Sequence, residues 1–333
     1  MSQDIRLSNF PKLIDYSYGY MMQEYVDYVS QAERVFSTDA PIDFDPNIPY
    51  YRAAVGVMDV NLQDRSDASP LLESSGAFED YYYQMSMRQK ATKMKVPPNV
   101  LRAGEKRIIS WFQEFSREAA REANSIKEQF FFDFLNYGPL TAGNKATFNN
   151  SIPGFVDPYP LFIYDSGPFF DGAHPQSSAV TATTYANLTE SLSFSRTNLK
   201  TVINTMANTN AYDRNGKKIV ISPNLVVAND VLKFTIDREL GASVEDGDLQ
   251  PNVVSSGINR IYSRYITDTD AWFMFDAGAG GVKDVLIVPN WRQPEMRVWF
   301  DEEIKCNWVS FEIFYGGVVR DWRRSYACNI AAA

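Results

Sequence analysis

The sequence has very few of the residues that most often bind metals or form disulfides. Its 333 residues include two cysteines, Cys306 and Cys328, and a single histidine, His174. Two cysteines this far apart are too few for a zinc site or for a disulfide framework. We therefore expect two reduced, partly buried thiols, and we expect the protein to hold neither a metal nor a cofactor.

Long hydrophobic runs are also missing. The sequence contains no run of about eighteen apolar residues, the length that a membrane-spanning helix needs. Residues 1–30 lack the basic start and the apolar stretch of a secretory signal. We therefore expect a protein that has no contact with a membrane and is made and used in a cytosol.

Basic residues are also fewer than acidic ones. Lysine and arginine number 32 against 41 aspartates and glutamates, which gives a formal net charge of -9. This balance argues against a protein that holds nucleic acid by neutralising many phosphates. It is compatible with a wall that encloses nucleic acid without sequence-specific binding, because a mildly acidic surface repels phosphate.

The overall composition is that of a folded chain. Hydrophobic residues make up 45% and charged residues 22%, so a largely disordered or fibrous protein is not expected. Aromatic residues reach 14%. Such large, rigid side chains serve protein interfaces as well as cores.

A calcium-binding loop is the first chemical pattern to test. Asp43, Asp45 and Asn47 begin like such a loop. However, Ile48 stands where the loop needs glycine, and Ala54 stands where it needs a bidentate glutamate. A proline-rich turn is the better interpretation of this segment.

A hydrolytic triad is the second pattern. Asp165, Ser166 and His174 supply its residue types, but the strand-turn-helix context and the glycine spacing of a nucleophile elbow are absent. We therefore interpret His174 as a structural residue of a loop.

A glycine-rich segment and an acidic run are the remaining candidates. After Gly278, Gly280 and Gly281, Lys283 occupies the last glycine position of a dinucleotide fingerprint, and a strand is expected where the fingerprint needs a helix. The acidic residues 301–303 are adjacent on an expected strand, so their carboxylates point to alternate faces and do not converge. We predict no catalytic residue and no enzyme.

The first part of the chain, residues 1–49, reads as an extended arm. Tyr18, Met21, Tyr25 and Tyr28 follow a helical spacing, and a turn-rich run with several prolines follows them. The arm has too little apolar surface for a core of its own. We expect it to lie across another surface.

Residues 50–97 are expected to form a long two-stranded hairpin. The strand-like runs are 55–60 and 81–96, and in the second run Tyr83, Met85 and Met87 alternate with polar residues. A two-stranded excursion is marginal by itself. It therefore needs a partner surface.

The clearest element is a long helix, predicted from Val100 to Leu135 with Gly138 as its stop. At about 1.5 Å per residue it would be roughly 54 Å long, several times the usual helix. The apolar residues of its stripe recur every three or four positions and are Ile108, Phe112, Phe115, Ala119, Ala123, Ile126, Phe130 and Phe134. The length favours a flat subunit that the helix spans from side to side.

The rest of the chain mixes helices and strands. We expect a helix capped near Thr189 and closed by a turn at 213–216, then a strand at 218–221. Ser222 and Pro223 should open a second helix through Leu225. Further strands are expected at 271–275 and 285–289 and around Val298, Trp308, Phe311, Ile313 and Tyr315. The fold class is α+β, with distant strands meeting.

This order of elements resembles the Hong Kong 97-type capsid fold of tailed bacteriophages. Residues 213–227 resemble the turn, strand and helix start of the axial domain in such capsids, 164–175 the loop that leads into it, and 314–322 the closing strands. The resemblance implies an arm at 1–49, an extended hairpin (E-loop) at 50–97, a peripheral domain with the spine helix at 98–180, an axial domain at 181–290 and closing peripheral strands at 291–333.

The same resemblance implies a major capsid protein. Such a subunit assembles with itself into hexamers and pentamers of an icosahedral shell around the double-stranded DNA of a tailed phage. It would be assembled in the host cytoplasm and found in the virion. Its partners would include a separate scaffolding protein and a portal, and decoration proteins are left open. The residues expected at subunit contacts are Tyr18, Tyr25, Tyr28, Tyr81, Tyr82, Tyr83, Met85 and Met87.

Covalent joining of subunits through the hairpin is not expected. Lys90, Lys93 and Lys95 lie in the strand from which some capsids of this kind form such a link, but no acceptor or catalytic carboxylate can be identified. Solvated lysines at a sheet edge are the better interpretation.

Two alternatives remain at this stage. The first is an encapsulin-like compartment, which has the same fold but is loaded with an enzyme. The second is a soluble enzyme or carbohydrate-binding protein that works as a monomer or dimer.

Overall fold

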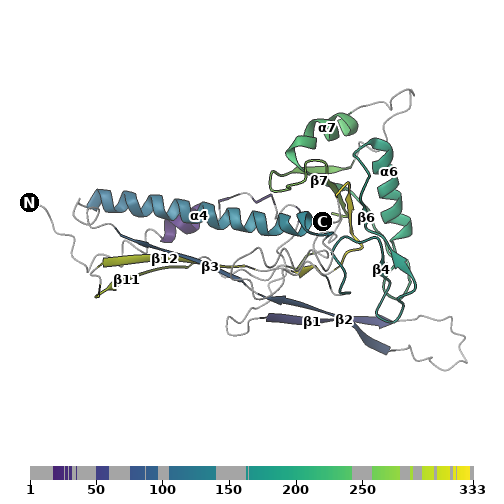
Figure 1. The fold of residues 1–333 in the computed structure, drawn as a ribbon, viewed down its shortest axis with the longest axis horizontal. Coiled ribbons are helices and arrows are strands. Elements are labelled where there is room, and N and C mark those ends of the chain that lie inside the picture. The colour runs from purple at the N-terminus through teal and green to yellow at the C-terminus, as the bar shows by residue number, and fades with distance from the viewer. Residues whose placement is uncertain are drawn as a thin grey trace, which may run out of the picture.

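The structure is a computed structural model, and the protein in it is elongated, with a compact half at one end (Figure 1). The residues that it describes are 18–25, 27–28, 30–31, 35, 50–59, 76–86, 88–96, 105–139, 163, 165–241, 257–277, 286–287, 295–303, 306–315, 318–319 and 321–330. They contain both helices and sheets, as the α+β prediction requires. The turn-rich run 41–49, the loop 63–75 and the glycines 278, 280 and 281 lie outside the described residues.

One helix joins the two halves. α4 (Glu105–Asn136) is a single helix of 32 residues, or about 48 Å at the usual rise. It starts five residues later than predicted, with 100–104 outside the described residues. Its predicted stripe is confirmed, because six of the eight residues are buried and Phe115 and Ile126 are partly buried against them.

Gly138 ends the helix where the sequence predicted, for a steric reason. A Cβ atom at this position would collide with the ring of Phe170 and would lie 2.8 Å from the carbonyl oxygen of Phe134. The backbone N–H of Phe170 donates to the carbonyl of Gly138 at 3.1 Å. The close approach therefore ties the end of α4 to the segment that follows.

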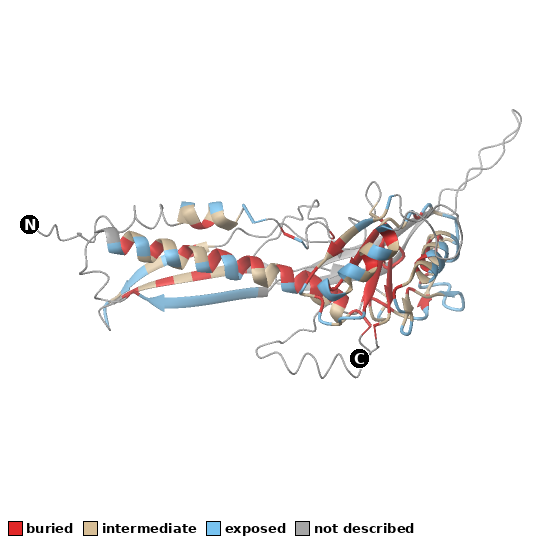
Figure 2. Ribbon diagram, turned by 90° about the horizontal axis from the view of Figure 1, so that it is seen from above, coloured by how far each residue is buried: buried red, intermediate tan, exposed pale blue. Residues whose placement is uncertain are grey.

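The elongated half consists of α4 and one three-stranded antiparallel sheet. Its strands are β3 (Arg88–Lys95), β11 (Glu295–Asp301) and β12 (Cys306–Tyr315), in the order β11-β12-β3. Met296 and Val309 of the sheet and Val96 after β3 are buried with Ile108 and Phe112 of α4. The strands in this half are covered by the helix on one face (Figures 1 and 2).

The hairpin differs from its prediction, because its strands begin five residues earlier than the predicted runs and because the second run is divided. β1 (Tyr50–Asp59) pairs with β2 (Gly76–Ser86), but the predicted single run 81–96 is split between β2 and β3. β3 pairs with β12 and belongs to the elongated half. An alternating pattern predicts a strand without naming its partner, which is why the sequence could not separate the two.

The compact half is built on a five-stranded mixed sheet in the order β6-β14-β9-β7-β8. Its strands are β6 (Leu188–Thr189), β7 (Leu225–Ala228), β8 (Asn259–Tyr262), β9 (Trp272–Phe275) and β14 (Ser325–Cys328). Every residue of β7, β9 and β14 is buried. The predicted strand 271–275 is confirmed as β9.

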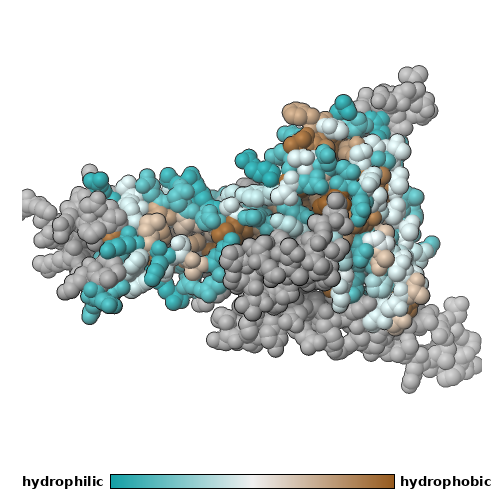
Figure 3. All heavy atoms as spheres, viewed as in Figure 1, coloured by the Kyte–Doolittle hydropathy of each residue, from teal (hydrophilic) through white to brown (hydrophobic). Residues whose placement is uncertain are grey.

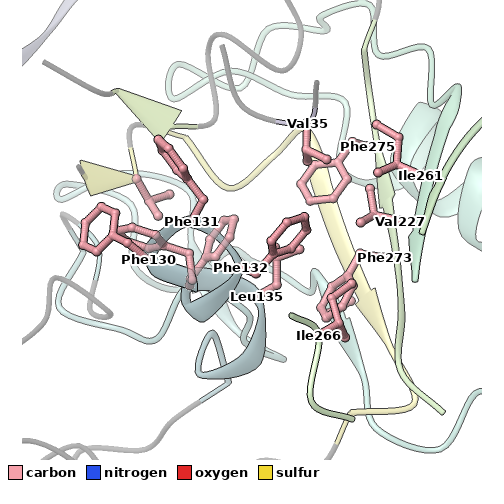
Figure 4. Close-up of a cluster of buried hydrophobic side chains, with 14 of the residues drawn as sticks. Val35, Phe130, Phe131, Phe132, Leu135, Val227, Ile261, Ile266, Phe273 and Phe275 are labelled. Carbon is pink, nitrogen blue, oxygen red and sulfur yellow. The ribbon is translucent and has the colours of Figure 1, made fainter. Parts of the chain in front are cut away.

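Each face of this sheet has its own hydrophobic layer. On one face Val227, Phe273 and Phe275 pack with Phe132 and Leu135 from the end of α4 (Figure 4). On the other face, strand residues such as Trp272 and Met274 pack with α6 (Arg196–Asn204) and α7 (Lys233–Gly241). The sheet is therefore covered on both sides.

Two helix predictions in this half are wrong at their starts. α6 is capped by Ser195, whose hydroxyl accepts from the backbone N–H of Asn198 at 3.2 Å, whereas Thr189 lies in β6. Leu225 lies in the buried strand β7, and the helix that follows begins with the 3-10 turn η3 (Asp230–Leu232). A short, fully buried strand carries no alternation that would distinguish it from a helix.

The remaining elements are short. They are β4 (His174–Pro175), β5 (Thr184–Tyr185), the π-helical turn η2 (Thr205–Thr209), β10 (Leu286–Ile287) and β13 (Val318–Val319). The turn at 213–216 is present, with Gly216 at φ +77. Of the predicted strand 218–221, only Lys218 makes a strand-like bridge, to Tyr212.

Candidate subunit interface

The arm segment lies along α4 of its own chain. Residues 18–25 are helical, Met21 is fully buried, and Tyr18 and Tyr25 are half-buried against the core (Figure 2). The arm was expected to lie across another surface. For these residues, that surface is α4 of the same chain. Contact of Tyr18 and Tyr25 with a second subunit stays a prediction.

Polar contacts hold the arm in place. A guanidinium N–H of Arg117 donates to the hydroxyl of Tyr20 at 2.6 Å, and the guanidinium also lies over the Tyr20 ring at 5.8 Å. The backbone N–H of Gln31 donates to the carboxylate of Glu128 at 2.8 Å. Glu128 is fully buried in α4. Sequence reasoning missed these residues, although a glutamate inside an apolar helix stripe was a usable signal.

Tyr28 is the most exposed of the three predicted arm tyrosines, at 41%. Its pKa is raised to about 12, mainly by partial burial and also by the nearby Glu128 and Tyr265, while Arg264 opposes the shift. The phenol therefore stays neutral at physiological pH, and part of its ring remains open for a further contact.

The hairpin register sorts the predicted contact residues into two sets. Partners across the strands are Tyr51 and Met85, Ala53 and Tyr83, Ala54 and Tyr82, and Val55 and Tyr81. Because directly opposed residues share a face and neighbours alternate, Tyr81, Tyr83 and Met85 lie on one face of the ribbon. Tyr82 lies on the other, beside Gln84 and Arg52. Met87 is outside the described residues.

The three lysines of the hairpin run lie on β3, at an edge of the elongated half. Lys90, Lys93 and Lys95 are exposed, as the interpretation of solvated edge lysines requires. The ammonium group of Lys93 lies 4.8 Å from the centre of the Trp308 ring. This cation-π contact gives one of them a structural role.

His174 lies in β4 and is held by a buried hydrogen-bond network that does not include Ser166. One ring nitrogen, Nδ1, lies 2.8 Å from a carboxylate oxygen of Asp165, and the other, Nε2, lies 3.1 Å from the side-chain oxygen of Asn187. The ring is buried and stacks on Trp322 at 4.4 Å. Both nitrogens are thus engaged without Ser166, which is a turn residue at φ +65. These contacts give His174 a structural role, as predicted, although it lies in the short strand β4 and not in a loop.

Next to this network is a partly buried ion pair. Arg323 donates to the carboxylate of Asp321 at 3.1 Å and to the carbonyl of Gln176 at 2.8 Å. Burial opposes the charged form of Asp321, but the charges of Arg323 and Arg214 and the hydrogen bonds outweigh burial and lower the pKa of this carboxyl. Arg323 thereby joins the turn before β14 to the residue that follows β4.

The described residues offer no other chemical centre. No group of three or more histidine, cysteine or acidic side chains among them is arranged to hold a metal ion. The acidic run is a turn in which the Asp301 carboxylate accepts from the backbone N–H of Glu303 at 3.0 Å. Glu302 and Glu303 are exposed. In the described part of the chain, no helix combines the length and apolarity that crossing a bilayer needs.

Three apolar side chains of the compact half stand open to solvent, and sequence reasoning missed all of them. Phe234 is 83% exposed, Val220 82% and Val231 64%. Apolar surface is visible at the α7 end of the molecule (Figure 3). Single exposed apolar residues are normal on protein surfaces, and only a large contiguous apolar patch marks a contact between proteins.

Comparisons with known proteins give structural likeness only. No protein-family model and no curated protein matches the sequence. A chain of Microbacterium phage Oxtober96 is 9% identical with a TM-score of 0.50, and the match covers 90% of this chain and 91% of that chain. A chain from the capsid of the cyanophage P-SCSP1u is 8% identical with a TM-score of 0.50, and the match covers 88% and 86%. Over most of its length, therefore, the chain has a fold similar to that of a phage capsid chain.

Proposed function

We propose that this chain is the major capsid protein of a tailed bacteriophage. In this role it assembles with itself into hexamers and pentamers of an icosahedral shell that encloses double-stranded DNA. The observation that carries the proposal is the likeness in fold to the cyanophage capsid chain over 88% of this chain. The protein would act in the virion after assembly in the host cytoplasm.

The finer organisation is part of the same proposal. The arm (1–49), the hairpin (50–97) and the spine helix would belong to a Hong Kong 97-type subunit, with the peripheral domain at 98–180 and 291–333. The axial domain was predicted at 181–290, and the compact sheet that would form it also includes β14 (Ser325–Cys328), from the range predicted as closing peripheral strands. A separate scaffolding protein and a portal would complete the assembly.

The hairpin supports a role in assembly. Its two strands pair with each other, and the described residues contribute no third strand to this sheet. An isolated two-stranded ribbon is marginally stable in water. Another copy of the chain would supply the missing surface, and we expect it to bind on the face of the ribbon to which Tyr81, Tyr83 and Met85 belong.

The first experiment is to express the chain by itself and with candidate scaffolding proteins, and to image the products by negative-stain microscopy. Closed shells or rings are expected. A single small species at every concentration in light scattering would contradict the proposal and would favour a soluble enzyme or binding protein. Shells that package a protein cargo and no DNA in the native host would indicate an encapsulin-like compartment.

A matched pair of hairpin variants sharpens this test. Tyr83→Arg places a charge on the aromatic face, whereas Gln84→Arg places the same charge on the opposite face of the next residue. We expect Tyr83→Arg to remain soluble and to form no closed shells, because burying an unpaired charge in an interface is costly. Gln84→Arg should still assemble, and equal assembly of both variants would remove the aromatic face from the proposal.

A further inference from the structure

The hydrogen bonds of the buried His174 ring determine its charge. Its side chain is 0% exposed, and that of Asp165 is 1% exposed. An oxygen atom faces each ring nitrogen, with Nδ1 at 2.8 Å from Asp165 and Nε2 at 3.1 Å from Oδ1 of Asn187. A neutral imidazole has one donor nitrogen and one acceptor nitrogen. The roles of the two oxygens therefore decide how many protons the ring carries.

The orientation of the Asn187 amide is fixed by its other partners. Its nitrogen donates to the carbonyl oxygens of Phe169 at 3.0 Å and of Trp322 at 3.5 Å. Its oxygen accepts from the backbone N–H of Asp171 at 2.8 Å. Turning the amide over would place its oxygen against two carbonyl oxygens and its NH₂ group against an N–H, so all three bonds would be lost. The amide oxygen therefore faces the ring, and Nε2 donates to it.

The neighbour on the other side of the ring is an acceptor as well. One oxygen of the Asp165 carboxylate accepts from the backbone N–H of Gly167 at 3.1 Å, and the other faces Nδ1. Such a hydrogen bond favours the ionised carboxylate. A carboxylic acid is also a stronger acid than an imidazolium, so a proton between the two groups lies on the ring. Nδ1 therefore donates too, and a ring that donates from both nitrogens is a cation.

The surroundings of the ring suit a cation. The ring stacks on the indole of Trp322, with their centres 4.4 Å apart and an angle of 11° between the planes. The face of an indole attracts positive charge. Asp165 supplies the opposite charge that a buried cation needs.

The other ionisable groups nearby are compensated or neutral. The guanidinium of Arg323 lies over the Trp322 ring at 4.7 Å, and it donates to Asp321 at 3.1 Å. Burial, together with Tyr212, raises the pKa of Tyr185, which lies opposite His174 across β4 and β5, so this phenol is neutral at physiological pH. The remaining charged groups close to this network are Asp171, whose carboxylate accepts from the backbone N–H of Ala173 at 3.2 Å, and Arg214, whose charge acts on Asp321.

The ring connects four separate segments of the chain. They are the turn at 165–167, β4, residue 187 before β6, and residue 322 before β14. The backbone carbonyl of residue 187 also accepts from the N–H of Ala327 in β14 at 2.8 Å. Loss of either ring proton would leave an oxygen atom facing an unprotonated nitrogen in a buried place, where unpaired polar atoms are costly.

We propose that at neutral pH the His174 ring carries a proton on both nitrogens, and that this buried cation holds the segment 165–175 against the compact sheet. The stabilisation is present while the ring is protonated and is lost as the pH rises and the folded protein releases the proton. The segment then loosens at alkaline pH. The proposal goes beyond the proposed function and does not depend on it, because it requires only the folded chain.

Nitrogen NMR of the chain labelled with ¹⁵N-histidine tests the charge. The sequence has one histidine, so the spectrum contains one pair of ring signals. Magic-angle-spinning spectra are accessible whether the chain is assembled or not. At pH 7.5 an ordinary histidine, which titrates near about 6.5, is mostly neutral. We expect two protonated ring nitrogens at this pH, and one unprotonated nitrogen would overturn the proposal.

A matched pair of variants tests the role of the carboxylate. Asp165→Asn keeps the size of the side chain, and its amide can donate to Nδ1, so the ring should become neutral at pH 7.5 with its proton on Nε2. Asp171→Asn removes a nearby carboxylate that contacts a backbone N–H instead of the ring, and it should leave both ring protons in place. Two protonated nitrogens in Asp165→Asn would contradict the assigned ion pair.

Melting temperatures at pH 7 and pH 9 test the structural consequence. The unmodified chain should melt at a lower temperature at pH 9. His174→Gln removes the titrating group, so it should melt lower than the unmodified chain at pH 7 and lose less between the two pH values. Equal losses in both chains would show that the ring proton does not hold the segment, and would overturn that part of the proposal.

Discussion

The two halves of the molecule are stabilised in different ways. In the compact half a five-stranded sheet is covered on both faces, and its three central strands are entirely buried. In the elongated half one helix covers one face of a three-stranded sheet, and Trp299 of that sheet remains 40% exposed. The compact half resembles a complete domain core, whereas the elongated half depends on α4 and on what lies against its outer surfaces.

α4 connects the elongated half to the core of the compact half. Its last turns contribute Phe131, Phe132 and Leu135 to the core of the compact half (Figure 4). Its first turns contribute Ile108 and Phe112 to a smaller cluster. Disruption at the two ends of the same helix should therefore have unequal consequences, which the following variants measure.

The largest effect is expected for Phe273→Asp. Phe273 is fully buried in the central strand β9, where it packs with the end of α4. A carboxylate there has no described partner charge at hand and would be buried without compensation, so the whole chain should fail to fold. The measurement is the soluble yield and the near-ultraviolet circular dichroism. A soluble variant with native spectra would show that the core of the compact half tolerates a buried carboxylate, which a closed core should not.

A smaller, local effect is expected for Phe112→Asp. Phe112 is equally buried, but it belongs to the small cluster of the elongated half. The first turns of α4 and strands β11 and β12 should lose protection in hydrogen-exchange mass spectrometry, whereas β7 and β9 keep theirs. Phe112→Leu is the matched control, because it preserves an apolar side chain. Loss of protection throughout the chain would mean that the two halves unfold as one unit.

The smallest effect concerns acid stability of the compact half. The pKa of Asp321 is lowered from its ordinary value of 3.8, so the folded state favours the ionised carboxylate. The stabilisation is present above the ordinary value and is lost as the pH falls through the lowered one. Asp321→Asn should therefore reduce the melting temperature at pH 7 and reduce it less at pH 3.

The control for acid stability is Glu302→Gln, which removes a carboxylate of the same charge from an exposed turn. Glu302→Gln should leave the difference in melting temperature between pH 7 and pH 3 as it is in the unmodified chain. If Asp321→Asn behaves like this control, the pair with Arg323 makes no net contribution to folding.

The comparison of the halves also accounts for what the sequence could predict. The long helix was predictable because its apolar stripe repeats over 32 residues. β7 was not, because a strand buried on both faces has no polar positions to mark its period. For residues 18–25 of the arm, the composition could not indicate that α4 of the same chain receives them.

Exposed apolar residues were the least predictable feature. Phe234 follows Val231 at a helical spacing that is equally typical of a buried face. Only the position of α7 against the sheet shows that Ile236 and Leu240 point inward and Phe234 outward. The hairpin gave a different case, because the alternation of Tyr83, Met85 and Met87 predicted a strand and residues 76–86 form one, while Met87 lies outside the described residues.

An unbroken α4 has a mechanical consequence. A continuous helix of this length fixes the distance between the two ends of the molecule. If the chain forms the proposed shell, that shell cannot widen by stretching each copy. A change of particle diameter would instead come from rotation of whole copies about their contacts, with the hairpins as the parts that change neighbours.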